Sequence, residues 1–266
     1  MKKPQASDRP AFAIGRAERV SDAIRRVVAQ DLRWIEAALQ DADLERVHPA
    51  RRRLKRCRAL LRVAGRRVPA AVRDALRETA GALGRIRDRQ VREAITAGPG
   101  VGDAPDGADH PAAPPGADDS ATFETSAQAL GKVRAALAGL DFAGGRRMMN
   151  RALEEAMIRQ RKAYRRARAT EDTEDFHDWR KTLQNLASLC QFGGTRLQRS
   201  ARLGRHAGKA IALLGEDHDL ALLETPPGAP SASGLAVRRA LLQREAIRKG
   251  RALERLAAPA LRRREG

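Results

Sequence analysis

Two segments of the chain carry a histidine that is followed three residues later by an arginine. The first pair is His48 with Arg51, and the second is His177 with Arg180. Both side chains donate hydrogen bonds, and the planar guanidinium matches two oxygens of one phosphate. Residues three apart on a helix share a face, so each pair would present its donors together. The pattern predicts contacts with a ligand that carries phosphate groups.

A second landmark follows each pair at a nearly equal interval along the chain. It is a Leu-Gly pair with an aspartate shortly after it: Gly84 and Asp88 in the first copy, Gly215 and Asp219 in the second. A single His-x-x-Arg would mean little, but two ordered landmarks that occur twice predict an internal duplication. The glycines would permit close helix packing, and we expect each aspartate to bond an arginine or a helix start.

These landmarks resemble the pattern of the conserved histidine α-helical domain, or CHAD, family. In that family a His-x-x-Arg-x-x-x-Lys/Arg-Arg helix occurs twice, each time before a Leu-Gly-x-x-Arg/Asn-Asp segment. The resemblance implies one all-α domain at 10–263, with two helical bundles related by pseudo-twofold symmetry around a basic groove. It also implies binding of inorganic polyphosphate and association with polyphosphate granules. The second copy departs from the pattern at Gln184 and Asn185, so we expect the first copy to contribute more of the binding.

Read as a helix, the first segment separates an apolar face from a cationic face. The apolar face consists of Val47, Ala50, Leu54, Cys57, Leu61 and Ala64. The cationic face consists of His48, Arg51, Lys55, Arg58 and Arg62. It extends about 21 Å at a rise of about 1.5 Å per residue, and it borders the core. The alternative is a solvated basic face on a protein whose arginine content partly reflects genomic base composition.

The candidate polyphosphate-binding residues come from five regions. In the first segment they are His48, Arg51, Arg52, Lys55, Arg56, Arg58 and Arg62. In the second segment they are His177, Arg180 and Lys181. Supporting candidates are Arg33 and Lys162, which precede the two motif histidines by the same interval, Arg159 and Arg166 beside Lys162, and Arg202 and Lys209 further on.

The motif histidines His48 and His177 admit three roles. A metal ligand needs converging His, Cys or carboxylate partners, and a general acid or base needs a positioned bond or water. Their neighbours are arginines, which favour the third role, a phosphate hydrogen-bond donor. Those arginines favour neutral imidazole in the free protein, and bound phosphate favours the charged form. We therefore expect binding to weaken as the pH rises through the pKa of the complexed histidine, and we expect no metal or cofactor.

The elements that must position these residues are helices. Apolar residues recur at helical spacing, and β-branched and aromatic residues are sparse. A Gly/Pro/Ala/Asp-rich segment, 97–121, predicts a flexible linker between a first half, 10–96, and a second half, 122–263. A surface loop is expected at 225–234. The predicted helices are 18–42, 46–64, 69–82, 84–96, 122–139, 144–170, 174–191, 196–213, 217–223 and 234–258.

Composition limits the classes of function. Lysine and arginine total 52 against 33 acidic residues, and the formal net charge of +19 indicates a polymeric anionic partner. Aromatic residues make up 3% of the chain, which disfavours single-strand binding by base stacking; a nucleic-acid-binding protein remains the alternative. Neither a P-loop nor the ExExK signature of the enzymes associated with the family is found. We expect a non-catalytic binding protein, with a polyphosphate-processing enzyme as the weaker alternative.

Location follows from the same reading of the sequence. The N-terminal segment has no apolar stretch typical of a secretory signal, and no segment approaches the length of a membrane span. We therefore expect a cytoplasmic protein without membrane partners. The sequence makes no prediction of oligomeric state.

Overall fold

The computed structural model describes residues 12–15, 17–96, 117–140, 145–193, 198–223 and 232–265. Its helices are α1 (Val20–Gln40), α2 (Val47–Ala64), α3 (Ala70–Thr96), α4 (Ala117–Ala138), α5 (Arg146–Thr170), α6 (Thr173–Gly193), α7 (Gln198–Leu223) and α8 (Ala232–Glu265). Short 3₁₀ turns, Leu44–Arg46 and Gly65–Arg67, flank α2. No strand occurs among the described residues, so the predicted all-α class is confirmed.

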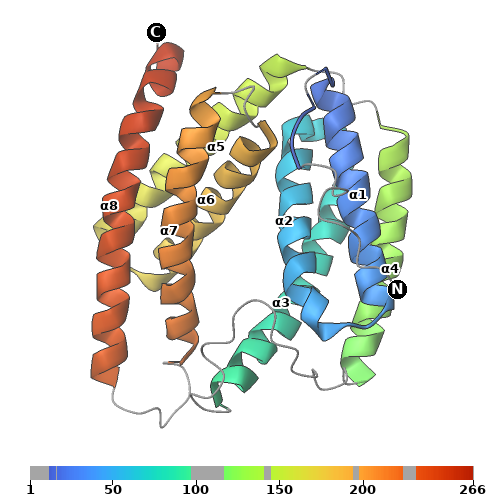
Figure 1. Ribbon diagram of the computed structural model, residues 1–266, viewed down its shortest axis with the longest axis horizontal. Coiled ribbons are helices and arrows are strands. Elements are labelled where there is room, and N and C mark those ends of the chain that lie inside the picture. Colours follow the sequence, from blue (N-terminus) through green and yellow to red (C-terminus); the bar gives the residue numbers. More distant parts are fainter. Residues whose placement is uncertain are drawn as a thin grey trace, which may run out of the picture.

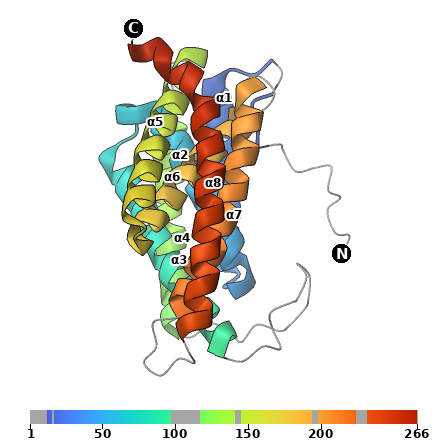
Figure 2. The same ribbon diagram turned by 90° about the vertical axis from the view of Figure 1, so that its left-hand side faces the viewer.

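The helices form two groups that lie side by side (Figure 1). In the first group, α1 and α3 each pack against both α2 and α4. In the second group, α6 packs against α5 and α7, and α8 packs against α7 and α5. Figure 2 shows α8 on the outer side of this group. The groups meet where α2 contacts α5 and α6 and where α3 contacts α7. This arrangement is consistent with the predicted pair of bundles, while duplication and pseudo-twofold symmetry stay predictions.

Both motif helices bury the apolar faces that the sequence predicts. In α2 the buried residues include Val47, Ala50, Leu54, Cys57, Leu61 and Ala64. In α6 they include Phe176, Trp179, Leu183, Leu186 and Cys190. The side chains next to these faces therefore have fixed directions, because an apolar face turned toward the core sets the rotation of a helix. α2 ends at Gly65, whose φ of 62° lies in the left-handed region that favours glycine.

Two predicted helix boundaries are wrong. Residues 70–82 and 84–96 belong to the single helix α3, and residues 198–213 and 217–223 belong to the single helix α7, so the predicted breaks within them do not occur. Gly84 and Gly215 therefore lie inside helices. A glycine in a helix interior costs about 1 kcal/mol relative to alanine, but it keeps its backbone hydrogen bonds and does not end the helix.

The predicted linker, 97–121, is wrong from residue 117 onward, where α4 begins. Asp118 and Asp119 occupy its first turn, where carboxylates interact favourably with the helix dipole, and Arg89 of α3 pairs with Asp119. Because α4 packs against α1 and α3, it groups with helices of the first half, whereas the sequence assigns it to the second half. Residues 97–116 and 224–231 lie outside the described residues, and α8 begins within the predicted loop.

Candidate anion-binding site

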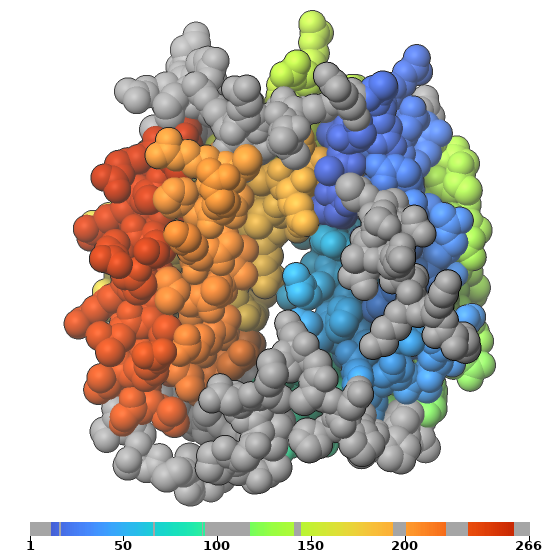
Figure 3. Space-filling view, in the orientation of Figure 1, coloured from blue at the N-terminus to red at the C-terminus, as the bar shows by residue number. Residues whose placement is uncertain are grey.

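A cavity of about 1020 Å³ lies between the two groups of helices. Its walls come from α2 and α3 on one side and from α5, α6 and α7 on the other, and Figure 3 shows the molecule hollowed between α2 and α6. The cations that line it are Arg51, Lys55, Arg58, Arg62, Arg77, Arg159, Lys162, Arg166, Arg180 and Lys181. The carboxylates among its lining residues are Asp88 and Asp178. The described wall of the cavity therefore carries a large excess of positive charge.

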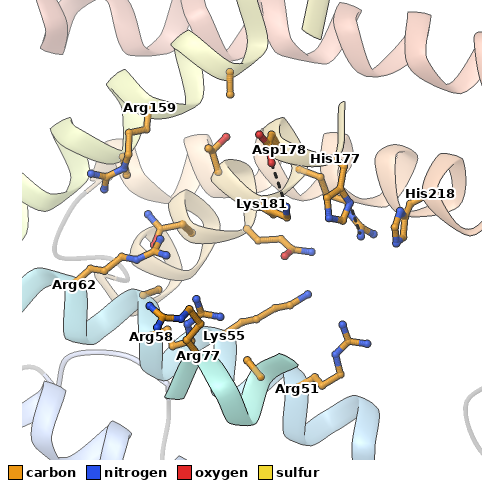
Figure 4. A pocket seen from close by; sticks show the side chains of 18 of the residues that line it. Arg51, Lys55, Arg58, Arg62, Arg77, Arg159, His177, Asp178, Lys181 and His218 are labelled. Atoms are coloured by element: carbon orange, nitrogen blue, oxygen red, sulfur yellow. Dashed lines mark hydrogen bonds and ion pairs between the residues drawn. The ribbon is translucent and has the colours of Figure 1, made fainter. Parts of the chain in front are cut away.

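The cationic face of α2 forms one wall of this cavity. Arg51, Lys55, Arg58 and Arg62 follow one another along the helix and extend toward α5 and α6 (Figure 4). Arg62 donates to Asn185 Oδ1 of α6 at 3.2 Å, which joins the two groups directly. The direction of these side chains follows from the buried face of α2, one residue away around the helix. The sequence prediction that this face borders the core is confirmed by the burial of its neighbours.

Each motif arginine lies over the glycine of its own second landmark. A Cβ on Gly84 would lie 3.6 Å from Arg51 Nη2, and a Cβ on Gly215 would lie 4.0 Å from Arg180 Nη1. Arg51 also pairs with Asp88 at 3.5 Å, as expected for a structural aspartate. Each motif helix is therefore in contact with the Leu-Gly landmark that follows it, although the two are distant in sequence. The glycines leave room for a guanidinium where α3 and α7 pass the motif helices.

The two motif histidines occupy different surroundings. The His177 ring stacks on His218 with centroids 4.7 Å apart, and both line the cavity. Arg180 Nη2 lies 3.5 Å from His177 Nδ1. His48 is solvent-exposed and is not among the lining residues, so the structure does not bring it to the cavity. His218 of α7 lies in the site instead.

Burial and nearby cations keep both cavity imidazoles neutral. Burial lowers the pKa of His177 to about 4, with further contributions from Lys181 and Arg180. The pKa of His218 is also lowered to about 4, first by burial and then by Arg180. The expected direction, toward neutral imidazole, is therefore present, although burial contributes more than the arginines. His48 shows the same direction, from burial and then Arg87.

Four of the cations that line the cavity have lowered pKa values for similar reasons. Burial, followed by Arg51 and Arg180, lowers the pKa of Lys55 to about 8. Burial is also the first cause of the lowered pKa of Arg58, Arg62 and Arg180. A positive charge is unfavourable where solvent is excluded and like charges are close. A bound anion would relieve both effects.

The α5 candidates reach the cavity because α5 contacts α2 directly. Arg159, Lys162 and Arg166 line it, as does Lys181, which pairs with Asp178 at 3.1 Å. Arg166 already pairs with Asp175 at 2.5 Å and with Asp178 at 2.9 Å. Its charge is therefore partly compensated before any ligand arrives.

Five further candidates do not line the cavity. Arg33 of α1 lines a second cavity of about 210 Å³ beside α4, because α1 packs against α2 and α4 within the first group. Arg56 points toward α1, where it pairs with Asp31 at 2.9 Å, and Asp31 is buried with 4% of its surface exposed. Arg52 is exposed away from the cavity lining. Arg202 and Lys209 lie on the face of α7 that carries His206.

The contributions that sequence reasoning missed come from other helices. Arg77 of α3 lines the cavity, and so do Gln184 and Asn185 at the two positions where α6 departs from the family pattern. Gln184 and Asn185 were noted only as lost cations. No spacing rule identifies Arg77, because its position depends on how α3 crosses α2. The sequence could have identified His218 as a site residue, because it directly precedes the landmark Asp219.

The two lowered imidazole pKa values predict a loss of stability in acid. Above pH 6.5 both histidines are neutral in the folded and the unfolded chain. As the pH falls from 6.5 through about 4, the unfolded chain takes up protons before the folded protein does, which favours unfolding. We expect the Tm of the ligand-free protein, followed by circular dichroism, to fall across this range.

The control carries His177→Gln and His218→Gln. It should show a smaller fall in Tm between pH 6.5 and 4 than the original protein. Equal slopes for the two proteins would contradict the assignment of lowered pKa values to these histidines.

Other kinds of site find little support in the described part of the chain. No group of three or more His, Cys, Asp or Glu side chains there could hold a metal ion. Cys57 and Cys190 are free and buried, and burial raises the pKa of both thiols. None of the helices described has the length and apolar character needed to cross a membrane.

Comparison with known proteins gives one match. Neither a curated protein nor a solved structure is significantly similar to the chain. The family model of the CHAD domain matches residues 22–225, which include both motif helices and both Leu-Gly landmarks. The matched region ends before α8 begins. Because the match covers most of the 266 residues, the chain belongs to the CHAD domain family.

Proposed function

We propose that this protein binds linear inorganic polyphosphate without catalysis, in the cavity between its two groups of helices, and associates with polyphosphate granules in the cell. The observation that carries the proposal is the convergence of cations from α2, α3, α5 and α6 on one cavity. Phosphate oxygens are good acceptors for arginine and lysine, and each phosphate of the polymer brings negative charge. Membership in the CHAD family supports the same ligand.

The shape of the cationic surface favours a chain over a single phosphate. From Arg51 to Arg62 the cations of α2 span about 16 Å at a rise of about 1.5 Å per residue. Figure 4 shows Arg51 and His218 toward one end of this surface and Arg62 and Arg159 toward the other. A single phosphate would neutralise only a few of these groups. A polymer could follow the whole row.

Burial of charge, together with repulsion between neighbouring cations, is unfavourable in this cavity, and binding of an anion would relieve both. The pKa values of Lys55, Arg58, Arg62 and Arg180 are all lowered, so their charged forms are disfavoured in the free protein. Binding of a polyanion converts this repulsion into attraction. It also favours protonation of Lys55 and of the two cavity histidines, so protons are taken up on binding.

The proposal predicts a strong salt dependence of binding. A polyanion that loses counterions at about six phosphate contacts should bind on the order of 1,000-fold more weakly at 200 mM than at 50 mM salt. Isothermal titration with polyphosphate of defined length, at a series of salt concentrations, measures this slope. An affinity that is absent at 50 mM salt, or that does not change with salt, would contradict binding in this cavity.

Two competing functions are distinguished by simple assays. If polyphosphate is the ligand, it should displace duplex DNA at a much lower phosphate concentration than DNA needs to displace polyphosphate. The reverse order would favour a nucleic-acid-binding protein. Incubation with polyphosphate and Mg²⁺ should release no orthophosphate above the background, and sustained release would identify an enzyme.

A further inference from the structure

Lys55 has an unusual position within the cavity. It lies one helical turn from both Arg51 and Arg58 on α2, and its side chain extends toward α6 (Figure 4). The side chain keeps contact with solvent, although the surrounding walls of the cavity displace much of the water near its amine. Arg180 of α6 adds a further positive charge on the opposite side. Lys55 is therefore an accessible amine within a cluster of guanidinium groups.

No described carboxylate lies within 4.0 Å of the Lys55 ammonium group, in contrast to two other lysines of the described chain. Lys181 pairs with Asp178 at 3.1 Å, and Lys249 of α8 pairs with Glu245 at 2.8 Å. A carboxylate at this distance stabilises the protonated, unreactive form of an amine. Burial, followed by the charges of the neighbouring arginines, acts in the opposite direction at Lys55. These effects outweigh the more distant carboxylate of Asp88 and lower the pKa of Lys55 to about 8. At pH 8 the Lys55 amine would be neutral in about half of the protein molecules. An ordinary lysine side chain would be neutral in about 0.3% of them.

We propose that the Lys55 amine is a modification site that acyl phosphates acylate directly, and that this acylation weakens the binding of polyphosphate. The second part rests on the proposed function. An acyl phosphate joins a reactive carbonyl to a phosphate, and the guanidinium groups of Arg51, Arg58 and Arg180 would bind that phosphate beside the amine. Other acyl donors lack a phosphate at the reacting carbon, so the cavity would not orient them in this way.

The reaction balances without a further reagent. The neutral Lys55 nitrogen attacks the acyl carbon, the C–N amide bond forms, and the C–O bond to phosphate breaks. Inorganic phosphate leaves with the electron pair of that bond, and the amine proton passes to it or to water. The nearby guanidinium groups stabilise the departing phosphate. Nothing is oxidised or reduced, and the amide product carries no positive charge.

The first test measures which lysines react. The full-length protein is incubated at pH 8 with acetyl phosphate, and the acetylated fraction of each lysine is followed by peptide mass spectrometry. We expect Lys55 to react on the order of tenfold faster than Lys181 and Lys249. Its rate should level off above about pH 8, whereas the rates of the ion-paired lysines should continue to rise. A neutral acylating ester should show weaker preference for Lys55. Reaction of Lys55 no faster than Lys249 would overturn the proposal.

The second test measures the consequence for binding. Acetylated protein should bind polyphosphate about tenfold more weakly than untreated protein, because one charged contact is lost. The matched control is Lys55→Arg, which keeps the charge but has no acylable amine, so the same treatment should leave its affinity unchanged. An equal loss in both proteins would overturn the proposed effect on binding. Untreated protein that fails to bind polyphosphate would refute the proposed function, while the acetylation rates would still decide the modification site.

Discussion

A protein that carries Arg51→Ala and Lys55→Ala is expected to bind polyphosphate on the order of 100-fold more weakly than the original protein. Each substitution removes a charge-assisted contact from the wall of the cavity. Such contacts contribute about 1.5–3 kcal/mol each, and the lower value for both together corresponds to about 100-fold. Isothermal titration at low salt measures the loss. Removal of Arg51 also separates α2 from Asp88, so thermal denaturation must first show that the variant is folded.

The matched control removes two charges from α8, through Arg251→Ala and Arg255→Ala. Both side chains are exposed and lie outside the cavity lining, so the net charge changes equally while the cavity stays intact. We expect less than about threefold weaker binding. Arg239 also lies on α8, but it is unsuitable as a control because it forms an ion pair with Asp217. Asp217 is buried, with 2% of its surface exposed. Equal losses in the two variants would mean that net charge alone determines binding.

Gly250→Ala is expected to destabilise the protein by about 2–4 kcal/mol, because α8 has no room for a methyl group at this position. A Cβ on Gly250 would lie 2.9 Å from the Trp179 ring and closer still to the ring of Tyr164. Both aromatic residues are fully buried, and their ring centroids lie 5.1 Å apart. The new methyl group would push α8 away from α5 and α6. Chemical denaturation measures the change in the free energy of unfolding.

Gly131→Ala in α4 is expected to have the opposite effect on the free energy of unfolding. A Cβ on Gly131 would meet no atom within 4 Å, so alanine should stabilise the helix by up to about 1 kcal/mol. A similar destabilisation by both substitutions would contradict the close packing of α8 on Trp179. Because Trp179 lies between His177 and Arg180 on α6, Gly250→Ala should also weaken polyphosphate binding in the folded fraction.

The direction of the side chains on α2 follows from the sequence. The spacing of its apolar residues fixes which face is buried, and that face sets the positions of Arg51, Lys55, Arg58 and Arg62. The same rule fails for Arg56, because the sequence does not show that α1 supplies the buried carboxylate of Asp31 on that side of α2. Periodicity along one helix gives its rotation but does not identify its neighbours.

Arg33 and Lys162 show the same limit in another form. They hold equivalent positions before the two motif histidines, yet only Lys162 lines the main cavity. The difference arises because α5 contacts α2 across the boundary between the groups, whereas α1 packs on α2 and α4 within its own group. Equivalent positions in a repeat therefore need not have equivalent neighbours. Arg77 was missed for a related reason, since its place depends on the crossing of α2 and α3.

The contact between each motif arginine and its partner glycine has a consequence for how such chains can vary. Arg51 rests over Gly84, and Arg180 rests over Gly215. A methyl group at either glycine would only reach van der Waals contact, whereas a side chain that extends beyond Cβ would compete with the guanidinium for the same space. A mutation at one partner changes the steric clearance of the other, and the two positions should covary among descendants of this sequence. The arginine and the glycine are therefore expected to change together in evolution, although they are far apart in the sequence.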